Sequence, residues 1–119
     1  MCLDIVYKRH YPPLHVIRKG WKGFTYNTYS DYYTTPIQSA SIQFREGVWD
    51  EDPNDGNWLN PPYKLGFHIF DTKEEALVWF QHWGAYIHIK EVEYTDIVAE
   101  GRQSGHKVIV AKRVRILCA

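Results

Sequence analysis

Residues 66–84, GFHIFDTKEEALVWFQHWG, decide the fold, because a strand runs directly into a helix there. The apolar side chains of Phe67 and Ile69 are two residues apart, which is typical of one face of a strand. His68 and Phe70 lie on the other face. The chain then changes from a two-residue to a helical period, so this stretch predicts a strand with a helix packed on its sheet.

The start of the helix carries its own signal. Thr72 and Glu75 have the spacing of a capping box, in which the hydroxyl accepts from an early backbone N–H and the carboxylate reaches back to the cap. Asp71 and Glu74 offer the same device one residue earlier. The start is therefore defined to within one residue.

The helix is predicted over residues 72–83. Gly84 can adopt the left-handed conformation that ends a helix. One apolar stripe at helical spacing is expected to face the sheet, and it contains Ala76, Leu77, Phe80 and Trp83.

The remaining strands are predicted from alternation of apolar and polar residues. Pro12 and Pro13 are expected to interrupt the first strand, and residues 19–23 are expected to form a turn or bulge. The predicted strand segments are 3–7, 14–18, 24–28, 42–47, 65–70, 86–98 and 108–116. The sequence thus predicts one α+β domain over residues 1–119, with a mostly antiparallel, strongly twisted sheet of about six or seven strands and one main helix.

The composition is that of a globular protein, with 45% hydrophobic and 24% charged residues. Aromatic residues make up 16% of the chain, which exceeds the need of one small core, so some are expected in a groove or interface. The alternative is that a thin, strand-rich domain uses aromatic rings as wide core fillers.

The expected location is the cytoplasm. The sequence contains no apolar run of membrane-spanning length and no secretion signal at its start, and Cys2 and Cys118 stand at opposite ends. No membrane association is expected.

Charge is sorted along the chain although the formal net charge is zero. Residues 8–22 and 102–115 are basic, and residues 46–55 are acidic. If the two basic segments formed neighbouring strands, they would create one positive face; the alternative is a pair of solvated, aggregation-resistant edges. Zero net charge argues against binding to duplex DNA.

The first candidate site is aromatic and basic. Rings that stack on a base, combined with cations that neutralise phosphate, suit a nucleotide or a single strand. The candidate ligand-binding residues are Trp21, Lys22, Tyr26, Tyr29, Arg113 and Arg115.

The second candidate site is catalytic. Cys2 would become the N-terminal residue if Met1 were removed, and an N-terminal thiol beside a free amine can act as nucleophile and base together. His68 is the alternative base. Buried, inert cysteine packing competes with this interpretation.

Two groups of residues resemble metal sites, but the sequence predicts neither a metal ion nor a cofactor. His68, His82 and His88 would suit zinc only if their elements were neighbours. In the acidic segment 47–63, Asp50, Asp52 and Asn54 have calcium-loop spacing, but the required glycine and glutamate are replaced by Asp55 and Pro61. Ordinary turn chemistry accounts better for this segment.

Several short motifs are spread over nearly the whole chain: Met1-Cys2-Leu3, Gly66-Phe67-His68 with Phe70, Glu75-Ala76, Asp96-Ile97 with Gly101, and Val110-Ala111-Lys112 to Ile116. Together they resemble a group of small uncharacterised proteins common in phages and prophages. The resemblance implies a mobile-element setting, in which small proteins bind a host component or a signalling nucleotide to disarm defence. It implies no activity.

We therefore expect a non-catalytic binding protein from a phage or mobile element that modulates a host defence component. Its expected partner is a host protein or a small nucleotide, and it is a possible homo-oligomer. A small enzyme using Cys2 or His68 is the alternative, and a structural or assembly protein is a further one.

Overall fold

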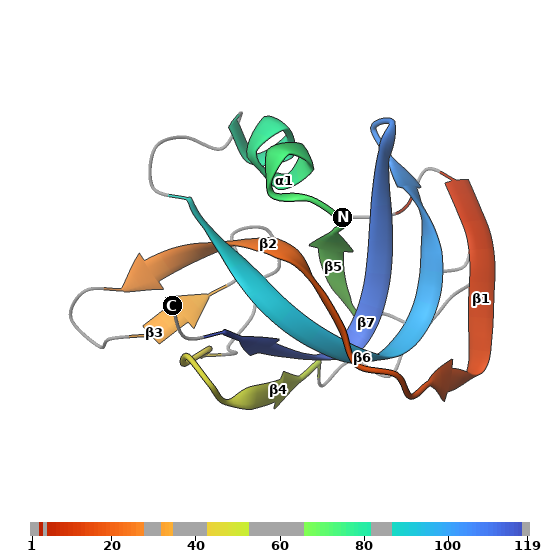
Figure 1. Cartoon of the computed structure of the whole chain (residues 1–119), viewed down its shortest axis with the longest axis horizontal. Coiled ribbons are helices and arrows are strands. Elements are labelled where there is room, and N and C mark those ends of the chain that lie inside the picture. Colours follow the sequence, from red (N-terminus) through yellow and green to blue (C-terminus); the bar gives the residue numbers. More distant parts are fainter. Residues whose placement is uncertain are drawn as a thin grey trace.

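The computed structural model of the chain describes residues 3, 5–27, 32–34, 43–52, 66–81 and 87–117. These residues contain seven strands and one helix (Figure 1). The elements are β1 (Ile5–Leu14), β2 (Arg18–Asn27), β3 (Tyr32–Thr34), β4 (Trp49–Glu51), β5 (Phe67–Phe70), α1 (Lys73–Phe80), β6 (His88–Gln103) and β7 (His106–Ile116). The predicted α+β class is therefore wrong: this is a compact β-rich fold with a single short helix.

The sheet is organised around the long hairpin of β6 and β7, which runs through the centre of Figure 1. The other edge of β6 pairs with β1 and β2, and the other edge of β7 pairs with β5 and β4. Strand β2 also meets β5 where Trp21 lies opposite Phe70. The pairing path β6–β2–β5–β7–β6 therefore closes on itself, and all of its pairings are antiparallel.

The hairpin can enclose a core because both strands change their inward face near the middle. In β6 the residues of the enclosed core move from even to odd positions between Tyr94 and Ile97, and Asp96 adopts a φ of 57° between them. In β7 the inward positions change parity between Ala111 and Val114. A positive φ is unusual outside glycine and marks a break in regular strand geometry.

Two apolar clusters fill the fold. The enclosed cluster contains Phe24, Phe44, Phe67, Ile69, Val92, Tyr94, Ile97, Ile109, Ala111, Val114 and Ile116. The outer cluster lies between the sheet and α1 and contains Leu3, Phe70, Ala76, Phe80, Val98, Ala99, Val108 and Val110. Strand β5 contributes Phe67 and Ile69 to the enclosed cluster and Phe70 to the outer one, and all four of its residues are buried.

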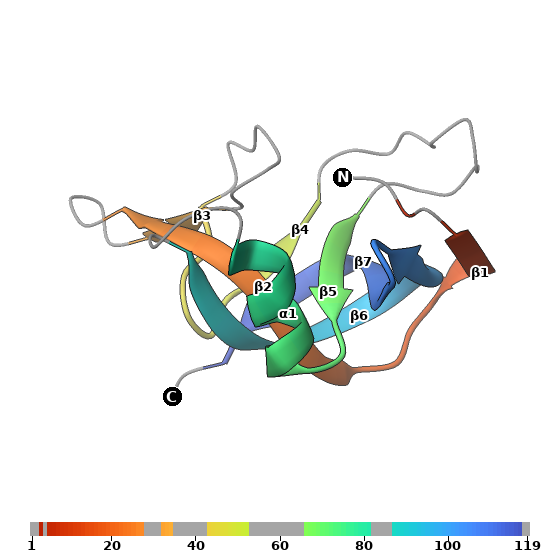
Figure 2. The ribbon, with the colours of Figure 1, turned by 90° about the horizontal axis from the view of Figure 1, so that it is seen from above.

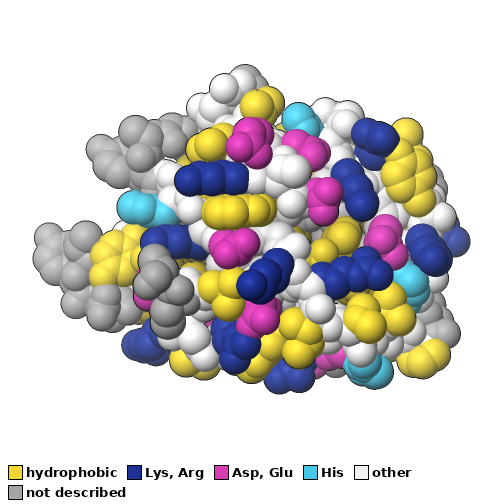
Figure 3. Space-filling view, in the orientation of Figure 1, with side chains coloured by type: hydrophobic (Ala, Val, Ile, Leu, Met, Phe, Trp, Pro, Cys, Tyr) yellow, Lys and Arg dark blue, Asp and Glu magenta, His cyan; other side chains and the backbone are white. Residues whose placement is uncertain are grey.

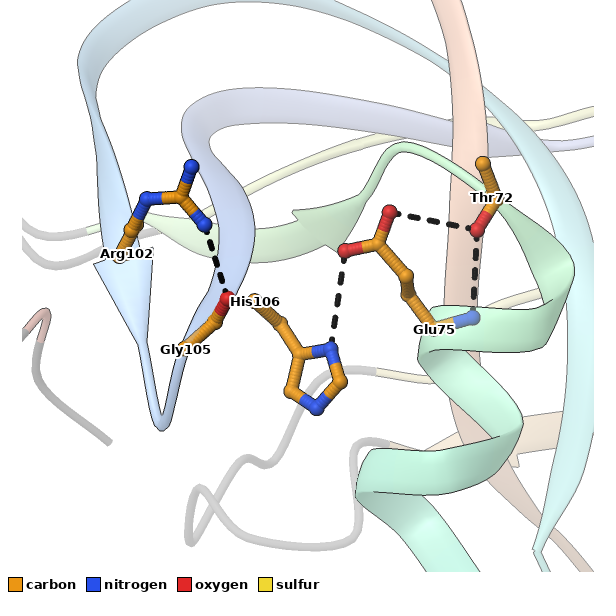
Figure 4. Close-up of polar contacts among 5 residues, drawn as sticks. All are labelled: Thr72, Glu75, Arg102, Gly105 and His106. Carbon is orange, nitrogen blue, oxygen red and sulfur yellow. Dashed lines mark hydrogen bonds and ion pairs between the residues drawn. The ribbon is translucent and has the colours of Figure 1, made fainter.

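Helix α1 packs against β2, β5 and β6, on the outside of the sheet (Figure 2). The predicted start is confirmed, because Thr72 is the N-cap and its hydroxyl accepts from the Glu75 backbone N–H at 3.2 Å (Figure 4). The Glu75 carboxylate also lies 3.6 Å from Nδ1 of His106, which connects the helix start to the tip of the β6–β7 hairpin (Figure 4). At that tip, Arg102 donates to the Gly105 carbonyl at 2.9 Å.

The helix differs from the prediction in length and in its buried face. It ends at Phe80 with Gln81 as C-cap, rather than continuing to residue 83. Ala76 and Phe80 are buried as expected, but Leu77 is 48% exposed. Trp79 takes its place and packs against the outer cluster. Trp83 and Gly84 lie outside the described residues.

Two predicted interruptions near the N-terminus are absent from the described strands. Strand β1 continues through Pro12 and Pro13, which is compatible with an edge strand and an irregular register before Leu14. Strand β2 runs through the predicted turn at residues 19–23. Its Gly20 and Gly23 serve close packing, since added Cβ atoms would lie 2.6 Å from Ile69 and 2.7 Å from Phe80.

Candidate functional site

Among the residues that it describes, the structure does not bring the predicted ligand-binding residues together on one surface. Lys22 points into the enclosed core and is only 4% exposed. Its ammonium lies 5.9 Å from the ring centroid of Phe24 and 5.7 Å from that of Phe67, and it donates to the His68 carbonyl at 3.4 Å. Burial lowers the pKa of Lys22 to about 8, partly offset by the charge of Asp52. Lys22 is therefore part of the interior.

Trp21 lies on the opposite face of β2, because successive strand residues alternate. It packs against the outer cluster, and the Lys73 ammonium of α1 lies 5.6 Å from its ring centroid. This tryptophan therefore helps to seat the helix.

Arg113 and Arg115 form a third, separate group. Their guanidinium groups lie 5.3 Å and 4.8 Å from the ring centroid of Trp49. Trp49 is on β4 and lies opposite Arg115 of β7. Arg115 also donates to Glu93, with an Nε–Oε1 distance of 3.1 Å. Its charge is therefore balanced within the sheet.

The side of the molecule in Figure 3 shows the same balance, with basic and acidic side chains interspersed rather than gathered in one positive face. The hypothesis that the two basic segments are neighbouring strands is not met, because β1 and β2 pair with β6 and not with β7.

Tyr26 lines a pocket, and this is the candidate site. The pocket has a volume of about 380 Å³ and is lined by Tyr26, Tyr33, Arg45 and Glu46. The two tyrosine rings touch, with centroids 4.8 Å apart and planes at 45°. The volume of the pocket lies in the range of small-molecule sites, and its lining combines two aromatic rings with two charged side chains.

Strand pairing builds this pocket from distant segments. Tyr26 of β2 lies opposite Tyr33 of β3, and Tyr33 exchanges two backbone hydrogen bonds with Phe44, at 2.8 Å and 2.7 Å. Arg45 and Glu46 follow Phe44 directly and so reach the tyrosine pair. The bridge between Tyr33 and Phe44 therefore fixes the position of both charged residues.

Strand β6 adds a cation to the rim of the pocket. The Lys90 ammonium lies 5.5 Å from the Tyr33 ring centroid and 3.9 Å from Oε1 of Glu46. His88 packs edge-on against both tyrosines, with centroid distances of 6.2 Å and 6.3 Å. The charge of Arg45 also acts on Asp50, whose pKa is raised by burial and lowered in part by that guanidinium. Lys90 therefore faces the Glu46 carboxylate, whereas the charge of Arg45 acts on Asp50.

Of the predicted ligand-binding residues, only Tyr26 lines the pocket, and Tyr29 lies outside the described residues. Tyr33, Arg45, Glu46 and Lys90 were not predicted. The crowding of tyrosines at residues 26–33 was the available signal, but nothing local shows that residues 45 and 46 meet them.

The candidate catalytic residues gain no support. His68 is 3% exposed and its Nδ1 lies 3.0 Å from Oε1 of Gln103. Burial lowers its pKa to about 3, against the opposing effect of the Gln103 hydrogen bond, so it is neutral near pH 7. Cys2 lies outside the described residues.

The candidate metal residues are also separate where they are described. His68 contacts Gln103, whereas His88 contacts the tyrosine pair; His82, Asn54, Asp55 and Pro61 lie outside the described residues. Within the described residues, no three or more His, Cys, Asp or Glu side chains are placed to hold a metal ion.

No protein-family model, curated protein or solved structure matches the chain. In the described part of the chain, no helix has the length and apolar character needed to cross a membrane.

Proposed function

We propose that the protein acts by binding a small, planar, anionic ligand such as a nucleotide in the pocket of Tyr26, Tyr33, Arg45 and Glu46. The observation that carries the proposal is the combination of two tyrosine rings and a cation in one pocket, with Lys90 at its rim. Base–aromatic stacking contributes about 1–3 kcal/mol, and an arginine can bind phosphate through two parallel hydrogen bonds.

This pocket is better suited to such a ligand than the other predicted residues. Lys22 is buried, Trp21 packs under α1, and Arg115 is paired with Glu93. Arg45 also acts on an acidic neighbour, Asp50, but it is exposed and lines a cavity. The phage origin, the host-defence role and a protein partner stay predictions, as does a homo-oligomer.

Calorimetry of the full chain against a panel of cyclic and linear nucleotides tests the proposal. We expect binding that weakens with salt, because attraction to phosphate is screened. Arg45→Gln should weaken binding and flatten its salt dependence, whereas Arg9→Gln, on the exposed β1, should change neither. Tyr26→Leu should weaken binding at every salt concentration, and Tyr7→Leu on β1 is its control.

Absence of binding to every nucleotide in the panel would overturn the proposal. Equal loss in Arg45→Gln and Arg9→Gln would overturn the assignment of the pocket, because the effect would then be one of overall charge. If the purified protein instead captured a host protein through another surface, the protein-partner alternative would replace the nucleotide.

A further inference from the structure

Glu46 is unexpected in a pocket for an anionic ligand, because a carboxylate repels phosphate. Its side chain is 40% exposed, and its ion pair with Lys90 spans 3.9 Å. A pair this long and this open to solvent contributes little, so a ligand can separate it at small cost. The carboxylate therefore remains available to a group that donates hydrogen bonds.

The chemistry of a carboxylate restricts which base it can recognise. An ionised carboxylate only accepts hydrogen bonds, and its two oxygens match two donors that lie side by side. The Watson–Crick edge of guanine presents such a pair, the N1–H and the 2-amino group. Adenine and cytosine place one donor beside an acceptor, and uracil flanks its single donor with two acceptors, so each sets a lone pair against the carboxylate.

We propose that the pocket selects guanine nucleotides, with Glu46 accepting hydrogen bonds from N1–H and the 2-amino group. The base then packs on the tyrosine pair, and Arg45 and Lys90 bind the phosphate. Arg45 is adjacent to Glu46 in the chain, so one turn presents both the cation for the phosphate and the acceptor for the base. This inference rests on the proposed function and names the ligand class of the same pocket.

Lys90 has a defined part in this arrangement. Its ammonium lies 5.5 Å from the Tyr33 ring centroid and 3.9 Å from the Glu46 carboxylate. Guanine replaces it as the partner of Glu46, and the flexible lysine chain then turns its charge to the phosphate. Binding thus replaces the weak ion pair between Lys90 and Glu46 with two contacts to the ligand, Glu46 to the base and Lys90 to the phosphate.

The experiment compares GMP, IMP and AMP by calorimetry with the full chain. The three share ribose and phosphate, IMP lacks only the 2-amino donor of GMP, and AMP presents one donor and one acceptor. We expect GMP to bind about 5- to 150-fold more tightly than AMP, the range for one bidentate base contact, with IMP in between. Glu46→Gln should weaken GMP binding and reduce the preference for GMP over AMP. Glu51→Gln on β4 should leave GMP affinity and this preference unchanged.

Equal affinity for the three nucleotides in the unmodified protein would overturn the guanine inference and leave the proposed function standing. Absence of binding to all three, and to the wider panel, would instead overturn the proposed function. A guanine preference that persists in Glu46→Gln would show that another group reads the base. The comparison of GMP with IMP needs no variant, so it decides whether the pocket selects guanine even if Glu46→Gln folds poorly.

Discussion

The buried Lys22 predicts that the protein becomes more stable as the pH rises from 8 to 10. Burial lowers the pKa of Lys22 from 10.5 to about 8 in the folded chain. Between these values the unfolded chain binds a proton that the folded chain does not, so the free energy of unfolding increases with pH. Tyr94 acts in the opposite direction above pH 10, because burial raises its pKa to about 12 and only the folded chain then keeps the proton.

The expected size of the effect follows from the two Lys22 values. Each pH unit over which only the unfolded chain is protonated changes the free energy of unfolding by about 1.4 kcal/mol. Allowing for incomplete titration at both ends, the increase from pH 8 to pH 10 is about 2 kcal/mol. Urea unfolding at pH 8, 9 and 10 measures it directly.

Lys22→Met isolates the contribution of this side chain. Between pH 8 and pH 10, the free energy of unfolding of the variant should increase by at least about 1.5 kcal/mol less than that of the unmodified protein, because methionine fills similar space without a proton to bind. Lys19→Met, at an exposed position of β2, should keep the full rise. Parallel curves for Lys22→Met and the unmodified protein would refute the reasoning, since the ammonium would then be as hydrated in the folded as in the unfolded state.

Three further predictions concern stability. Phe80→Ala should cost about 3–5 kcal/mol in urea unfolding because Phe80 is 3% exposed, and a loss below about 1 kcal/mol would contradict the buried face of α1. The unmodified protein should lose about 1.6 kcal/mol in its free energy of unfolding between pH 6.5 and 5, because the pKa of His68 is lowered from 6.5 to about 3 and protonation favours the unfolded chain; His68→Gln should lack this loss. Thr72→Ala should cost about 1 kcal/mol through loss of the N-cap, and an unchanged urea midpoint would exclude that role.

The parts of the fold that were predicted correctly are those encoded by neighbouring residues. The alternation around Phe67 and Ile69 gave β5, and the spacing of Thr72 and Glu75 gave the start of α1. Both signals act over one turn or a few strand residues. The predicted end of the helix at residue 83 was wrong, because Trp83 continued the apolar helical spacing beyond Phe80.

The fold class was wrong because it depends on contacts between distant residues. Closure of the sheet requires the single pairing of Trp21 with Phe70, and no local pattern indicates it. Pro12 and Pro13 would interrupt an inner strand, but an edge strand such as β1 tolerates them. Whether a strand lies at an edge depends on its pairing with distant segments. Gly20 and Gly23 were interpreted as turn residues, whereas their lack of a side chain lets Ile69 and Phe80 approach β2.

The site was only partly predicted for a similar reason. The composition indicated that aromatic and basic residues bind a ligand, but it could not show which of them face the core and which face solvent. Lys22 was assigned to the binding surface as a cation that neutralises phosphate, yet its position on β2 turns it inward. Tyr26 reached the pocket, but its partners Arg45 and Glu46 come from a segment that only the bridge at Phe44 brings near.

The segment that carries Arg45 and Glu46 is held at several points, and this bears on how the pocket binds. Phe44 is bonded to Tyr33, the Gly47 N–H donates to the Ile116 carbonyl at 2.8 Å, and the Asp52 N–H donates to the Lys112 carbonyl at 2.9 Å. The two charged residues therefore sit between fixed backbone anchors on β3 and β7. A ligand that binds here orders side chains but little backbone, so more of the stacking and charge energy is retained as affinity.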